Sequence, residues 1–131
     1  MKAQVSIELL SLLAVALLLL ILFNIWTYRF QSSTERDSTY FDAERVCSLL
    51  ANEINTAASI GDGYKKHFSL PSKLINYVDY NISVLPSGKL VVVSWRGRET
   101  WCDIISSNIS INTLNKGGNI IKNKKGEIII G

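Results

Sequence analysis

Few residues in this 131-residue chain are suited to catalysis or metal binding. There is one histidine, His67, and there are two widely separated cysteines, Cys47 and Cys102. A lone histidine and an isolated cysteine pair cannot complete a zinc site, so no metal ligand is assigned. The sequence also has no paired carboxylates, phosphate-binding loop or catalytic triad. We therefore expect no enzymatic activity, no catalytic residue and no cofactor.

Charge of one sign is not in large excess either. The chain has 14 Lys and Arg against 11 Asp and Glu, for a formal net charge of +3. No basic stripe is interleaved with aromatic residues, so a nucleic-acid partner is not expected. The one dense basic cluster, formed by Lys122, Lys124 and Lys125, is interpreted as the solvated tip of a hairpin.

Charge is wholly missing from one long segment near the N-terminus. The 20 residues from Leu9 to Tyr28 contain no charged side chain. As a helix, such a segment spans roughly 30 Å, which is the thickness of the hydrocarbon core of a bilayer. The chain therefore divides into a membrane-length segment and about 100 residues that fold outside it. This excludes a soluble cytosolic monomer.

A cleaved secretory signal peptide explains this segment poorly. The apolar run exceeds the usual length of about 7–15 residues, and its far end, Phe23–Tyr28, offers no small-residue cleavage site. A plain signal anchor fits the length but does not explain Glu8 at the edge of the run. From physics alone two readings of Glu8 stay open. It is either a headgroup-level residue in a first helical turn or a residue with a role of its own.

The residues around Glu8 form a recognisable pattern. Gln4, Ser6, Glu8 and Leu12 match, in spacing and order, the Q-x-S-x-E-x-x-x-L motif of archaeal class III signal peptides. The chain therefore resembles archaeal type IV pilin-like proteins. The motif covers only residues 4–12, but it lies at the extreme N-terminus and the apolar run follows it at once.

The resemblance implies a specific fate for the N-terminus. A prepilin peptidase would cut between Ala3 and Gln4, so that residues 1–3 are the leader and the apolar segment is retained. Glu8 would pair with the N-terminal amine of a neighbouring subunit and set the register of assembly, because an unpaired carboxylate among packed apolar helices is costly. An assembly ATPase and a membrane platform protein are the further implied partners. No nucleic acid is involved.

The sequence predicts an α+β fold in which a long N-terminal helix packs on an antiparallel sheet, as in pilins. Neither Pro nor Gly occurs from Gln4 to Ile60, so one helix is expected over this range. Residues 4–28 are its membrane or filament-core half, and residues 29–60 are an amphipathic extension whose apolar stripe includes Val46, Leu50 and Ile54. A transmembrane anchor followed by a separate second helix is the alternative, with Gln31–Thr34 as the weak point.

Residues 61–131 are expected to form a β-rich extracellular head. Alternating or β-branched runs predict a three-stranded meander over Tyr80–Leu85, Leu90–Trp95 and Thr100–Ile105, with a turn at Arg96–Glu99. Ile109–Leu114 is expected to be a fourth strand. Asn119–Lys122 and Glu127–Ile130 are expected to form a terminal hairpin.

Three further candidate features lie in the head or on the helical extension beside it. Cys47 and Cys102 either form a disulfide between helix and sheet, which is favoured outside the cytoplasm, or remain buried thiols. Asn81 and Asn108 begin N-glycosylation sequons. The aromatic residues are read as sheet core rather than as an exposed adhesive patch; they are Tyr80, Trp95 and Trp101.

These features favour a structural role. The chain is expected to be a major or minor prepilin-like subunit, in the membrane as a precursor with its head outside and in an extracellular filament when assembled. A membrane-anchored surface binding protein that never polymerises is the first alternative. A secretion-type pseudopilin is the second.

Overall fold

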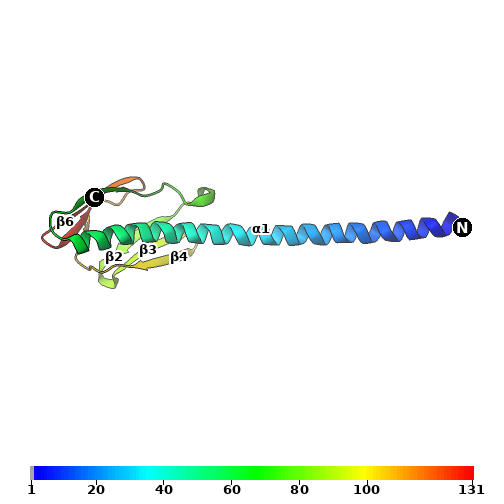
Figure 1. Ribbon diagram of the computed structural model, residues 1–131, viewed down its shortest axis with the longest axis horizontal. Helices are drawn as coiled ribbons and strands as arrows, with labels where there is room; N and C mark the ends of the chain where they lie inside the picture. Colours follow the sequence, from blue (N-terminus) through cyan, green and yellow to red (C-terminus); the bar gives the residue numbers. More distant parts are fainter. Residues whose placement is uncertain (1) are drawn as a thin grey trace. The chain divides into compact units, whose positions relative to one another are not determined.

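The computed structural model describes residues 2–131, with the side chains of residues 6–30 and 36–131 (Figure 1). One helix, α1, spans Lys2–Ile60, which confirms the expected long N-terminal helix. The helix ends at Ile60, and the next residue, Gly61, has a φ of 88° and donates its N–H to the carbonyl of Ala57 at 3.2 Å. The chain divides into two compact units, Met1–Asp37 and Ser38–Gly131, and this boundary lies inside the expected helical extension.

The described chain after α1 consists mainly of short strands (Figure 1). They are β1 (Lys65–Ser69), β2 (Asn81–Leu85), β3 (Leu90–Trp95), β4 (Arg98–Asp103), β5 (Ile109–Ile111), β6 (Gly118–Lys124) and β7 (Glu127–Ile130), with 3-10 helices η1 (Ile75–Tyr77) and η2 (Pro86–Gly88) between them. The architecture is therefore α+β, as expected.

The first sheet is the predicted antiparallel meander, in the order β2-β3-β4. Its second turn is tighter than expected. Arg96 and Gly97 alone connect the strands, with φ values of 43° and 73°, as two-residue hairpin loops require. The expectation of a turn over Arg96–Glu99 is therefore wrong at its end, because β4 already begins at Arg98.

The second sheet has the order β1-β6-β7-β5. The terminal hairpin of β6 and β7 is confirmed, although β6 extends to Lys124, two residues beyond its expected end at Lys122. Both outer neighbours of the hairpin come from elsewhere in the chain. β1 pairs antiparallel with β6, and β5 pairs parallel with β7. The expected strand Ile109–Leu114 is shorter than predicted, since it ends at Ile111, and it belongs to this sheet rather than to the meander.

Within the unit Ser38–Gly131, the apolar stripe of α1 forms the centre of the core. Val46, Leu50 and Ile54 are 2% exposed or less, as the helical spacing predicted. Both sheets supply side chains to the same core cluster; the fully buried ones among them are Val91, Val93, Ile121, Ile128 and Ile130.

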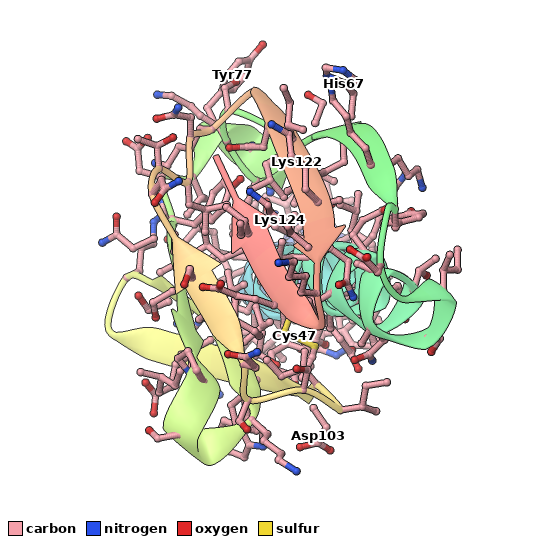
Figure 2. All side chains as sticks on the ribbon, turned by 90° about the vertical axis from the view of Figure 1, so that its left-hand side faces the viewer. Cys47, His67, Tyr77, Asp103, Lys122 and Lys124 are labelled. Atoms are coloured by element: carbon pink, nitrogen blue, oxygen red, sulfur yellow. A yellow bond between two sulfur atoms is a disulfide. The ribbon has the colours of Figure 1, made fainter. Side chains whose placement is uncertain are left out.

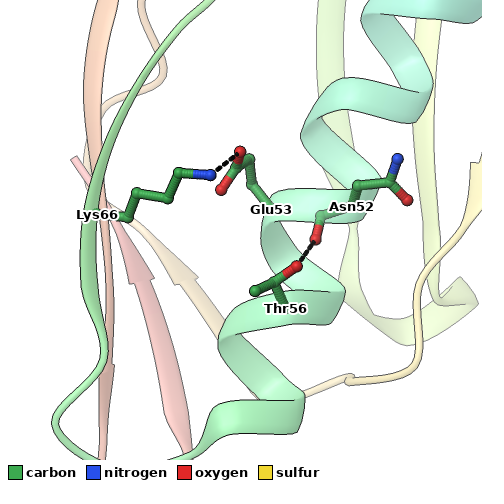
Figure 3. Close-up of polar contacts among 4 residues, drawn as sticks. All are labelled: Asn52, Glu53, Thr56 and Lys66. Atoms are coloured by element: carbon green, nitrogen blue, oxygen red, sulfur yellow. Dashed lines mark hydrogen bonds and ion pairs between the residues drawn. The ribbon is translucent and has the colours of Figure 1, made fainter.

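Polar contacts fix the position of α1 against the strands of this unit. The Asn123 side chain donates from Nδ2 to the carbonyl of Ala57 at 2.8 Å, and its Oδ1 accepts from Gly126 N at 3.0 Å. Lys66 Nζ lies 2.6 Å from Glu53 Oε1 (Figure 3), and this hydrogen bond raises the pKa of Lys66. The last turns of the helix are therefore tied to the second sheet at two places.

Candidate functional site

The apolar half of α1 is the most unusual surface of the protein. The segment Ser6–Phe30 has 25 residues; its most apolar 18-residue stretch has a mean hydropathy of 2.7, and none of that stretch is buried within the protein. Large side chains such as Leu12, Leu19 and Trp26 are 60–70% exposed. By length and composition this helix suits a membrane anchor, and a signal sequence near an N-terminus has the same properties.

Three polar side chains inside this segment form hydrogen bonds within their own helix. Ser11 Oγ donates to the carbonyl of Glu8, Asn24 Nδ2 to that of Leu20, and Thr27 Oγ1 to that of Phe23, each at 2.8 Å. A polar group that is satisfied locally costs little to transfer into an apolar environment. The segment can therefore contact lipid or other apolar helices without breaking these bonds.

The motif residues that the structure describes lie on this helix. Ser6, Glu8 and Leu12 are all exposed. Among the described side chains, none forms an ion pair or hydrogen bond with the Glu8 carboxylate. The side chains of Ala3 and Gln4, the expected processing site, lie outside the described residues.

Cys47 and Cys102 form the disulfide that was expected. Their Cα atoms are 5.9 Å apart, and the bond joins α1 to β4 across 55 positions of sequence. Cys47 has no exposed surface, and Cys102 is half-buried. The alternative of two free buried thiols is therefore not the state that the structure contains.

The two sequons lie in different surroundings. Asn81 and Ser83 are both exposed on the edge strand β2. The Asn108 amide instead donates from Nδ2 to the carbonyl of Gly126 at 3.2 Å, and the hydroxyl of its sequon partner Ser110 bonds to Glu127. Asn108 is exposed as well, so the two sequons differ in that the Asn108 side-chain amide is already hydrogen-bonded, whereas no hydrogen bond among the described residues engages the Asn81 side-chain amide.

The sheet-core interpretation of the aromatic residues is right for two of them and wrong for the third. Tyr80 and Trp95 are 2% and 5% exposed, and burial raises the pKa of the Tyr80 hydroxyl, which donates to the carbonyl of Pro71. Trp101 is 62% exposed because β4 turns it to the outer face of the meander. Sequence reasoning missed this direction. Side chains alternate between the two faces along each strand, so counting from Trp95 across the two-residue turn places Trp101 on the opposite face.

Among the described residues, no cluster of side chains is evidently suited to catalysis or metal binding. A hollow of about 500 Å³ at the turn between β3 and β4 is lined by Asn81, Ser94, Arg96, Arg98 and Glu99, among others. Ser94 lies opposite Glu99 in this lining, but no hydrogen bond among the described residues joins the Ser94 hydroxyl to a carboxylate that could act as its base. Within the described part of the chain, no three His, Cys, Asp or Glu side chains are grouped so as to hold a metal ion.

Comparison with known proteins adds no relative to this description. The chain matches no family model, no curated protein and no solved structure.

Proposed function

We propose that the chain is a structural subunit of an archaeal type IV pilus-like surface filament. The observation that supports this most strongly is the unburied apolar helix segment Ser6–Phe30 directly at the Q-x-S-x-E-x-x-x-L motif. A separate disulfide-bonded α+β unit follows in the same chain. A subunit of this kind needs an assembling helix and a separate head, and the division of the chain into two compact units supports this proposal.

The apolar helix would serve in two environments in turn. An exposed helix of this composition requires lipid or other apolar helices around it. Lipid tails and packed leucine-rich helices are similar as solvents, so the segment can leave the bilayer and enter a filament core without a large change in hydrophobic free energy. The precursor is placed in the cell membrane with its head outside, and the assembled subunit in an extracellular filament.

Glu8 would direct how subunits align. Cleavage by a prepilin peptidase between Ala3 and Gln4 creates a new N-terminal amine. The Glu8 carboxylate, exposed and without a partner among the described side chains, can pair with this amine in a neighbouring copy. Because an unpaired carboxylate is costly in an apolar core, only the register that forms this pair is favourable. An assembly ATPase and a membrane platform protein would drive the extraction.

The test is mass spectrometry of filaments sheared from the cell surface. We expect this chain among the filament proteins, with a mature N-terminus at Gln4. Recovery only from membranes would instead support the surface protein that does not polymerise. Recovery in short envelope-bound assemblies would support the pseudopilin. A mature protein that begins at Met1 would refute the class III assignment.

The role of Glu8 has its own test. Glu8→Ala should be processed normally but lost from filaments, and Glu8→Asp should restore part of the incorporation. Ser11→Ala is the matched control, because it removes only a hydrogen bond within the helix. Normal incorporation of Glu8→Ala would refute the register role and leave the filament proposal standing.

A further inference from the structure

The outer face of the second sheet carries unpaired positive charge. Lys65 on β1 lies directly opposite Lys122 on β6, and Lys124 follows on the same face; all three are exposed. Figure 2 labels Lys122 and Lys124 on this sheet. Like charges directly across a strand pair destabilise a sheet. Among the described side chains, none of these lysines forms an ion pair; Glu127, the cross-strand partner of Lys124, bonds instead to Ser110. We call Lys65, Lys122 and Lys124 the basic face.

The outer face of the meander carries the opposite charge around an aromatic ring. Glu99, Trp101 and Asp103 alternate along β4, so they lie on one side of it, and all three are exposed. Neither carboxylate forms an ion pair with a described side chain. We call these three residues the acidic–aromatic face. Figure 2 labels Asp103 at the lower edge of the head, away from Lys122 and Lys124.

The two faces match in spacing as well as in charge. Residues two apart on a strand are about 6.8 Å apart, which applies to Lys122 and Lys124 and equally to Glu99 and Trp101. One lysine can therefore meet a carboxylate while the next places its ammonium over the indole ring in a cation–π contact. Apolar residues flank both faces, since Ile129 lies beside Lys122 and Val92 beside Trp101.

We propose that the basic face of one copy docks on the acidic–aromatic face of a second copy. The two faces belong to different sheets, so the contact is heterologous: each copy keeps one face of each kind free for a further copy. Repetition of such a contact produces an open array, as a filament requires. The inference rests on the proposed function and adds to it a contact between heads.

A second copy is favoured over an unrelated polyanion because one chain carries both complementary surfaces at the same strand spacing. The test is a charge swap in the full chain. Lys122→Glu with Lys124→Glu should reduce the filament-bound fraction about tenfold or more, because like charges then meet across the contact. Glu99→Lys with Asp103→Lys should do the same.

Co-expression of the two reversed variants should restore incorporation, since each then offers a face that the other can bind. Arg36→Glu with Arg45→Glu is the control; it makes the same change in net charge at two exposed positions of α1 outside both faces, and neither arginine forms an ion pair with a described side chain. Thermal melts of each variant separate loss of contact from loss of fold.

Three results would overturn the inference. Normal incorporation of either reversed variant refutes the contact alone. Failure of co-expression to restore filaments from well-folded variants refutes the complementarity. Binding of a soluble acidic polysaccharide that needs the lysines, with filament content unchanged by their reversal, would assign the basic face to a polyanion. Absence of the wild-type chain from filaments would instead refute the proposed function, and the contact with it.

Discussion

The Cys47–Cys102 disulfide offers the most direct test of how the head is held together. It closes a loop of 55 positions that contains the end of α1, β1 and the first two strands of the meander. In the chain-entropy model, opening a loop of that size releases about 4 kcal/mol of unfolded-state entropy. We expect Cys47→Ala with Cys102→Ala to lose this amount from the free energy of unfolding. Alanine rather than serine is chosen at position 47 because the Cys47 side chain has no exposed surface, so a serine hydroxyl in its place would be fully buried.

The expected loss is large enough to measure by melting. For a unit of the size of Ser38–Gly131, 1 kcal/mol corresponds to about 4–8 °C in Tm, so the double variant should melt about 16–32 °C lower. The assay is circular dichroism of the full chain in detergent, followed at the β-sheet signal. The wild-type protein with a reducing agent is the matched control and should show a similar shift.

A decrease of less than about 5 °C in both samples would refute the reasoning. It would mean that the core around Leu50 and Ile54 holds α1 against the sheets without the covalent link. A large decrease in the variant but none on reduction would attribute the effect to lost packing of Cys47.

Further predictions concern single side chains of the head. Asn123→Ala removes two hydrogen bonds, one to the Ala57 carbonyl, which keeps the Gly61 N–H, and one from the Gly126 N–H; it should cost about 1–3 kcal/mol by urea unfolding, and an unchanged midpoint would contradict this. Trp95→Ala should cost about 3–5 kcal/mol, whereas Trp101→Ala should change folding stability by less than about 1 kcal/mol, and equal losses would show that the assigned burial is wrong. Burial raises the pKa of Tyr80. The contribution of its neutral hydroxyl to stability is therefore complete below the unfolded pKa of 10.0 and is lost as pH rises through the folded pKa. Ultraviolet titration should find one tyrosine that ionises at higher pH than the others, and Tyr80→Phe should remove it.

Local patterns determine which parts of this fold are predictable from sequence. The helix follows from the absence of Pro and Gly up to Ile60 and from the buried stripe around Leu50. The meander follows from alternating strands joined by short turns, which pair because they are neighbours in the chain. The pairing of β1 with β6 and of β5 with β7 joins distant segments, and no residue near either strand indicates its partner.

The candidate site divides in the same way. The membrane-length segment and the motif at Glu8 are each continuous in the sequence, so both can be recognised from the sequence alone. Lys65 lies opposite Lys122 because of the register between two strands that are distant in the chain, and the sequence does not show this register. For that reason the sequence alone indicates only a solvated turn around Lys122. The N-terminal amine that is expected to pair with Glu8 belongs to another copy of the chain, so the structure of one chain does not contain this pair.

The position of β7 has a consequence for how the head is made. β7 follows β1, β5 and β6 in the chain, yet it lies between β6 and β5 and buries Ile128 and Ile130 completely. The second sheet therefore cannot close until β7 has left the ribosome and, in an exported protein, crossed the membrane. Until then β5 and β6 expose unpaired edges, which are prone to wrong pairing. If export delivers the head unfolded and the second sheet closes only on the far side of the membrane, copies with an incomplete sheet would not meet one another before export.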